Sequence, residues 1–178
     1  LKTATFTSMP APTLADPAAM ATTTVASTLS VTWDDNSKTD YKLGYKAFFK
    51  TGDSVDKIGG GKILAGGYFD VNGNVIIDKS IAGQERQFFS DCPDGTSLLT
   101  VANAKVDGVT NPVFAVVQFE YTTRNQNEES MYGLLPSPIA ILTLDQDKTT
   151  GHLTFKKYHN VDTSKVNGLW ITCGASLS

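Results

Sequence analysis

The segment PVFAVVQFEYT, residues Pro112 to Thr122, contains the clearest strand pattern in this sequence. Successive side chains of a strand point to opposite faces, so odd-numbered and even-numbered positions form two separate rows. Both rows are mainly apolar: Val113, Ala115, Val117, Phe119 and Tyr121 form one, and Phe114, Val116, Gln118 and Glu120 form the other. A strand that is apolar on both faces is expected to be covered on both faces.

Apolar residues recur with a period of two elsewhere in the chain, and we find no convincing long helix. Turn signals separate these runs. Asn72-Gly73 predicts a type I′ hairpin turn, in which both central residues have positive φ, and Asp91 to Gly95 predicts a tight turn. The other strands that we expect are Leu29–Trp33, Tyr41–Lys50, Lys62–Val71, Val75–Asp78, Pro138–Asp145, His152–His159 and Leu169–Cys173.

Short strands separated by such turns about every 10 residues are typical of a β-sandwich, barrel or propeller. A propeller blade is built from repeated hairpins, and Ile139–Leu144 with Leu153–Tyr158 resembles half of one. We therefore predict an all-β fold that forms part of a β-propeller.

Composition excludes several classes of protein. The chain has 178 residues, of which 40% are hydrophobic and only 19% are charged, which argues against a wholly disordered chain. A net charge of −3 gives no electrostatic sign of nucleic-acid binding. No apolar run approaches the ~20 residues that a transmembrane helix needs, so we expect no transmembrane segment.

The two ends of the chain suggest how it is organised. Residues 1–28 are rich in Ala, Thr, Pro and Ser, which is typical of the extended mature start of an exported protein. Residues 29–178 are expected to form one folded region. The apolar run Gly168 to Cys173 lies close to the last residue, whereas domains usually end in polar surface segments. We therefore expect a C-terminal portion beyond residue 178 to complete the propeller.

Several motifs in the sequence are better explained by turns than by functional sites. Gly59-Gly60-Gly61-Lys62 lacks the Ser or Thr and the helix that a phosphate-binding loop requires, so a flexible turn is expected. Asp145, Asp147 and Gly151 do not have the spacing of an EF-hand, so a hairpin turn is favoured over a calcium loop. His152 and His159 would lie on opposite faces of one strand.

Glu120 and Cys173 are the candidate metal ligands. A carboxylate on an apolar face has to be paired, protonated or bound to a cation. Cys173 ends another apolar strand and is followed by small residues that permit a close approach of the backbone. A carboxylate and a thiolate at strand ends are a plausible ligand set. Ordinary burial, or a disulfide between Cys173 and Cys92, remains the alternative.

The same segments resemble the PhoX-type alkaline phosphatases. The family has a strand that ends in an E-Y-T-like motif, which is Glu120-Tyr121-Thr122 here. It then has a strand–turn–strand of the form L-x-x-D-x-x-T-G-x-L, found within Leu142 to Leu153. The family motif G-L-W-x-x-C-A-G-S is similar to Gly168 to Ser176, with Gly174 and Ala175 transposed. The resemblance covers about the last 65 residues.

This resemblance implies a β-propeller with a calcium and iron cluster at its centre. Glu120 would bind the metals and Cys173 would bind iron as a thiolate. The metals would polarise a phosphoryl oxygen of a small phosphorylated substrate, a phosphate monoester or a diester. The remaining ligands and the catalytic residues would lie beyond residue 178, in the C-terminal portion of the same precursor, whether or not that portion is a separate chain. The protein would be periplasmic, on the cell surface or extracellular.

Three other interpretations remain open at this stage. The same propeller is equally suited to be a non-enzymatic envelope or cell-surface protein used for binding or structure, because fold does not fix function. A purely structural interpretation joins Cys92 to Cys173 and places Glu120 in a buried ion pair. The third is another calcium-dependent hydrolase on the same scaffold, such as a lactonase or phosphotriesterase.

Overall fold

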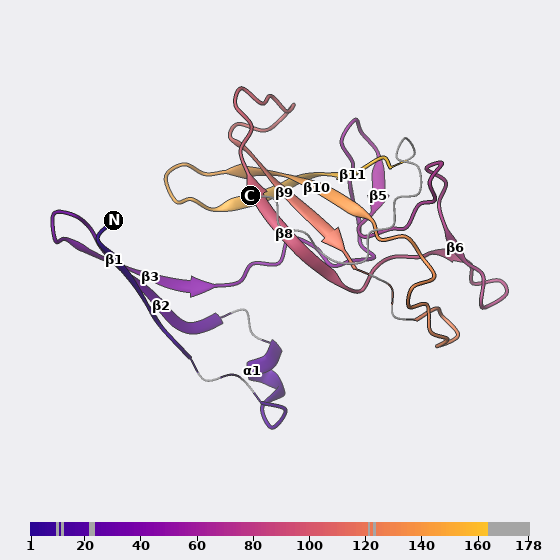
Figure 1. Cartoon of the computed structure of the whole chain (residues 1–178), viewed down its shortest axis with the longest axis horizontal. Helices are drawn as coiled ribbons and strands as arrows, with labels where there is room; N and C mark the ends of the chain where they lie inside the picture. The colour runs from indigo at the N-terminus through magenta and orange to yellow at the C-terminus, as the bar shows by residue number, and fades with distance from the viewer. Residues whose placement is uncertain (10, 12, 22–23, 121, 123, 164–178) are drawn as a thin grey trace. The chain divides into compact units, whose positions relative to one another are not determined.

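Strands form nearly all of the regular secondary structure in the computed structural model of the chain (Figure 1). It describes residues 1–178 except for 10, 12, 22–23, 121, 123 and 164–178. The all-β class predicted from the sequence is confirmed, and the sheets are small and antiparallel. The chain divides into two compact units, Leu1–Ala47 and a second that begins at Phe48.

The first unit contains a three-stranded antiparallel sheet in the order β1-β2-β3. Its strands are β1 (Thr3–Thr7), β2 (Thr24–Thr32) and β3 (Lys38–Gly44), and a short helix, α1 (Pro17–Ala21), lies between the first two. The first 28 residues, expected to be an extended segment, thus supply β1, α1 and part of β2 to this unit. The strand expected over Tyr41–Lys50 ends at Gly44, the last residue of β3 that pairs with β2.

The second unit is organised around a four-stranded antiparallel meander in which β8, β9, β10 and β11 are neighbours in chain order. These strands span Pro93–Leu99, Pro112–Phe119, Ile139–Gln146 and Leu153–Asn160. Leu142 lies opposite Ala115 on one side and Tyr158 on the other, so one row of side chains crosses the sheet. The strands predicted for Pro112–Thr122, Pro138–Asp145 and His152–His159 are therefore confirmed to within a few residues.

The hydrophobic core lies on one face of this meander. Val113, Ala115, Val117 and Phe119 of β9 are all buried, together with Leu142 and Leu144 of β10. Val55 and Ala65, from the chain before the meander, complete the cluster. Tyr158 is fully buried, and its hydroxyl accepts a hydrogen bond from Gly66 N at 2.9 Å, which ties the turn after β5 to β11. Burial raises the pKa of Tyr158 to about 12.

The opposite face of the meander is less covered. Phe114 and Val116 are half-buried and line an open, apolar groove of about 390 Å³ together with Ile141. The sequence predicted that β9 is covered on both faces. Among the described residues, the buried apolar side chains of β9 all lie on the core face, and those on the opposite face are only half-buried.

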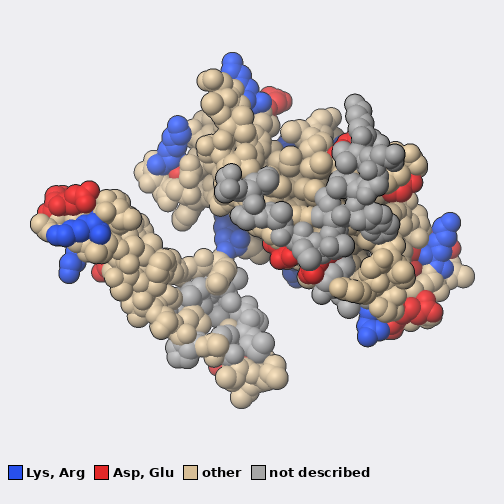
Figure 2. Space-filling view, viewed as in Figure 1, with Lys and Arg blue, Asp and Glu red and all other residues tan. Residues whose placement is uncertain are grey.

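Two small hairpins complete the second unit. β4 (Ser54–Asp56) pairs with β5 (Lys62–Leu64), and β6 (Ile77–Asp78) pairs with β7 (Arg86–Gln87). The Gly59-Gly60-Gly61 segment is the turn of the first hairpin, as predicted, and all three glycines have positive φ. Figure 2 shows Lys and Arg in small mixed groups with Asp and Glu on the face in view.

Two predicted turns differ from the structure. At Asn72-Gly73 only the glycine has positive φ, at 79°, and Gly73 N donates to Asp70 O at 2.9 Å. This is the three-residue hairpin loop with a glycine bulge rather than a type I′ turn. The tight turn expected over Asp91–Gly95 is instead the start of β8, with an irregularity between Pro93 and Thr96. A proline is tolerated at the first residue of a strand because its missing N–H removes no essential ladder bond.

Candidate functional site

Glu120 directly follows β9 and is half-buried. Its backbone N donates to Cys92 O at 2.9 Å, which extends the β8–β9 pairing by one residue beyond Pro93 and Phe119. The same pairing brings the two side chains together, with Cys92 Sγ 3.5 Å from Glu120 Oε2. The Ser137 hydroxyl donates to Glu120 O and fixes the backbone from the other side.

The Glu120 carboxylate has no cationic partner in the described part of the chain. The ion pairs there involve other acids, namely Asp34, Asp56, Glu128 and Asp145. The interpretation that placed Glu120 in a buried ion pair therefore has no support among these residues. A half-buried carboxylate beside a thiol, without a basic side chain, is suited to bind a cation.

The second predicted ligand, Cys173, lies outside the described residues. Its assignment as an iron ligand stays a prediction, and so does the alternative disulfide with Cys92. The thiol that the structure places beside Glu120 is that of Cys92, which the sequence analysis had assigned to a turn.

A fully buried tyrosine lies next to this pair. Tyr68 is 0% exposed, and its hydroxyl oxygen makes no hydrogen bond to any described residue. Burial is the main cause that raises the pKa of Tyr68. The Thr122 and Ser90 side chains lower it in part, and Asp91 and Cys92 raise it further. Tyr68 thus keeps its proton, and the hydroxyl is a donor that lacks an acceptor in the described residues.

The hydroxyl groups around Tyr68 are held by the backbone. Thr122 Oγ1 donates to Phe89 O at 2.7 Å, and Ser90 Oγ accepts from Cys92 N at 3.1 Å. Ser90 N in turn donates to Gly66 O at 2.8 Å. These bonds connect the start of β8, the end of β9 and the turn after β5 into one polar cluster at the edge of the core.

The Glu120–Cys92 geometry is compatible with metal binding. A tetrahedral metal with typical bond lengths of about 2.3 Å to sulfur and 2.1 Å to oxygen holds these two atoms roughly 3.6 Å apart. The observed separation of 3.5 Å is close to that. Among the described residues no cluster of three or more His, Cys, Asp or Glu side chains is found, so this region contributes two donors rather than a complete site.

The other acidic candidates have structural roles. Asp147 Oδ1 accepts from Thr149 N at 2.8 Å and from Thr150 N at 2.9 Å, which closes the hairpin turn that was predicted there. Asp145 Oδ1 accepts from Asn111 N at 2.8 Å, and the other carboxylate oxygen of Asp145 lies 3.7 Å from Lys156 Nζ. These contacts lower the pKa of both carboxyls; for Asp147 the first cause is the bond from Thr150 N and for Asp145 the bond from Asn111 N.

Comparison of the chain with protein-family models, with curated proteins and with solved structures gave no match. No helix in the described part of the chain is long and apolar enough to cross a membrane. The arguments for function therefore come from the residues themselves.

Proposed function

We propose that this chain is the N-terminal part of an exported, PhoX-type β-propeller phosphatase that depends on calcium and iron. Glu120 and Cys173 are the metal ligands that the resemblance implies. The observation that carries the proposal is the half-buried Glu120 carboxylate, which faces a thiol and has no basic partner in the described residues.

The β8–β11 meander supports the propeller. Four antiparallel strands connected in chain order form the usual blade of a propeller. Each blade of a propeller is covered on both faces by its neighbours. The open apolar groove beside Phe114 and Val116 is the kind of surface that a neighbouring blade covers. In this proposal the C-terminal portion of the precursor supplies that blade and the missing acidic ligands.

The residues of this chain would act by holding and shaping the site. When bound, calcium and iron supply Lewis acidity that polarises a phosphoryl oxygen. Glu120 would bind through its carboxylate, positioned by the Ser137 hydroxyl and by the bond from Glu120 N to Cys92 O. The Tyr68 hydroxyl, kept protonated by its raised pKa, would remain a neutral donor at the edge of this cluster.

Metal analysis of the intact purified protein, combined with release of phosphate from p-nitrophenyl phosphate, tests the proposal. We expect bound iron and calcium, and we expect Glu120→Gln to reduce metal content and activity together. Glu128→Gln is the matched control, because Glu128 is exposed and its ion pair with Arg124 is long, at 3.9 Å. A protein that carries neither metal and releases no phosphate would contradict the proposal.

The two cysteines can be separated by substitution. We expect Cys173→Ser to abolish the visible absorption of an iron–thiolate bond, and we expect Cys92→Ser to retain it. The opposite pattern would move the iron ligand to Cys92, the sulfur that lies beside Glu120 in the structure. Mass analysis of the oxidised, unreduced protein would show whether the two cysteines are joined.

A further inference from the structure

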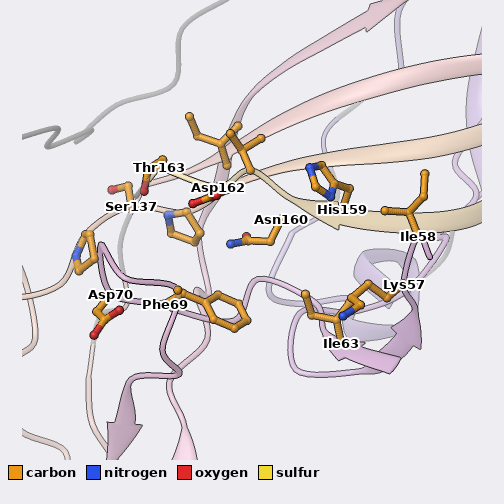
Figure 3. Close-up of a pocket in the computed structure, with 15 residues that line it drawn as sticks. Lys57, Ile58, Ile63, Phe69, Asp70, Ser137, His159, Asn160, Asp162 and Thr163 are labelled. Carbon is orange, nitrogen blue, oxygen red and sulfur yellow. The ribbon is translucent and has the colours of Figure 1, made fainter. Parts of the chain in front are cut away.

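A cavity of about 410 Å³ lies at the end of β11 (Figure 3); neither Glu120 nor Cys92 lines it, although Ser137, whose hydroxyl donates to Glu120 O, does. Its walls come from four parts of the second unit: the β4–β5 hairpin, the loop around Phe69 and Asp70, the segment Pro136–Ile139 and the segment His159–Thr163. The bond from Ile58 N to Tyr158 O, at 2.9 Å, holds the hairpin beside β11. This size suits a small organic molecule.

Asn160 gives the first indication of a ligand. Its amide lies in the hollow, with the Phe69 ring below it in the view of Figure 3. The Asn160 Oδ1 atom is buried and accepts no hydrogen bond from any described residue. Leaving a buried acceptor without a donor is costly, so its presence beside a cavity calls for a donor that no described residue supplies.

The charged side chains that line the cavity differ in whether they already have hydrogen-bond or ion-pair partners. Lys57 Nζ makes neither an ion pair nor a hydrogen bond with any described residue, and His159 lies at the same end of the hollow. Asp70 lies at the other end, where its Oδ1 accepts from Asn72 N and from Asn74 N, each at 2.8 Å. Asp162, the second acid of the lining, also has an interaction partner, so a cation is available at one end while both acids are already engaged.

The apolar walls restrict the shape of the ligand. The Phe69 ring lies between the two polar ends of the hollow and Ile63 lies at the Lys57 end (Figure 3); both are half-buried. An aromatic ring packs well against the C–H face of a sugar or against another flat ring. The lining thus combines an apolar side with one acceptor and one cation that have no partner among the residues that the structure describes.

We propose that this cavity binds a sugar-sized organic anion. Its phosphate or carboxylate would lie at the Lys57 and His159 end, a hydroxyl would donate to Asn160 Oδ1, and its ring would pack on Phe69. No bond is made or broken at this site and no metal is required. The inference goes beyond the proposed phosphatase activity and does not depend on it.

Calorimetric titration of the intact protein in the presence of EDTA tests the inference. The probes are glucose 6-phosphate, glucuronate and uncharged glucose. We expect both anions to bind with a Kd below about 1 mM and glucose to bind at least about tenfold more weakly. Similar binding of the two anions would indicate a general anion site, and preference for the sugar phosphate would indicate a phosphate site; both outcomes support the proposal. Binding of glucose as tight as that of the anions, or no binding of any probe at about 10 mM, would overturn it.

Substitution of Lys57 tests the role of its charge in binding. Lys57→Gln should weaken binding of both anions about five- to tenfold, because a charge-assisted hydrogen bond is lost. Lys105→Gln is the matched control, since Lys105 is exposed and does not line the cavity.

Asn160→Leu is the sharper test. It should weaken binding about tenfold and leave Tm unchanged or higher, because it removes a buried acceptor that has no donor. A lower Tm with unchanged binding would show that Asn160 is structural and would overturn its assigned role. Loss of phosphatase activity alone would not bear on this site, because binding is measured without metal.

Discussion

The β1–β3 sheet and the β8–β11 sheet are both antiparallel meanders, but they bury their apolar residues to very different extents. In the first unit, Val31 is the one hydrophobic residue found buried among those whose exposure the structure describes, and Phe6 is 66% exposed. In the second, β9 alone contributes four buried apolar side chains to the core. Strand pairing provides hydrogen-bond partners for backbone N–H and C=O groups in both sheets, whereas stability against unfolding comes mainly from the burial of apolar side chains.

The difference follows from which residues share a face. In the first unit, Phe6 pairs with Leu29 and Ala4 with Val31, so one face is apolar, while the other carries mainly Thr, Ser and charged side chains. In the second unit, the row through Leu142 meets Val55 and Ala65, which cover it. An apolar face contributes stability only when another element covers it.

The largest expected effect tests this contrast directly. Leu144→Ala removes a side chain with 0% exposure from the core and should lower the free energy of unfolding by about 2–5 kcal/mol. Phe6→Ala, in the exposed sheet, should change it by no more than about 0.5 kcal/mol. Urea unfolding followed by circular dichroism measures both. Equal costs for the two variants would mean that the first sheet has a covered core.

The two buried tyrosines provide a second comparison, within the second unit. Tyr158→Phe leaves Gly66 N–H buried without an acceptor and should cost about 1–3 kcal/mol of unfolding free energy. Tyr68→Phe removes a hydroxyl that bonds to no described residue and should be neutral or stabilising. Both variants remove only a tyrosine hydroxyl, so the difference between them in thermal unfolding reports the contribution of the hydrogen bond from Gly66 N to Tyr158. A larger loss for Tyr68→Phe would reveal an acceptor for that hydroxyl.

Asp78 should make part of the stability of the second unit depend on pH. Burial alone would raise the pKa of this carboxyl, but bonds from the Ser80 hydroxyl, Ser80 N and Gln126 N lower it on balance. The ionised form is thus favoured by folding, so the stabilisation is present above the ordinary pKa of 3.8 and is lost as pH falls through the lower folded value.

Asp78→Asn should therefore cost about 1–2 kcal/mol of unfolding free energy at neutral pH. The difference from the natural protein should shrink as the pH falls below the ordinary carboxyl range. Urea unfolding at several pH values measures this, with Asp107→Asn as an exposed control. A difference that is constant with pH would exclude a role for the charge.

The smallest expected effect concerns the exposed unit. The N-terminal amino group of Leu1 lies 3.2 Å from Asp34 Oδ2, and both groups are largely exposed. Ion pairs of this kind contribute little, so Asp34→Asn should change the unfolding free energy by less than about 0.5 kcal/mol. A clear loss of stability that disappears at high salt would show that this pair is stronger than its exposure implies.

The strands of the second sheet could be predicted from the sequence because the alternation of their side chains is visible within each segment. Pro112–Thr122 repeats apolar residues on two faces, and β9 occupies Pro112–Phe119 of it. The Tyr41–Lys50 prediction extended too far, because a strand requires a pairing partner and β2 offers none beyond Thr24. Periodicity within a segment carries no information about where its partner ends.

The candidate site could be predicted from the sequence only in part. Glu120 stood out because a carboxylate follows an apolar strand, and the structure places it half-buried. Cys92 was expected in a turn, but it directly precedes β8, and Glu120 directly follows β9, the strand that pairs with β8. Pairing Pro93 with Phe119 necessarily makes the residues just outside them neighbours. A predicted β8–β9 register would have found the pair.

The sequence by itself determined the all-β class, the main strands and the glycine turn of the β4–β5 hairpin, because side-chain alternation and backbone freedom act over a few residues. Tertiary structure alone decided which sheet acquires a core, which thiol faces Glu120, and that Asn160 presents an acceptor to a cavity beside Lys57. These features join residues that are distant in the chain, and their energies depend on burial and on hydrogen-bond partners that only the folded arrangement supplies.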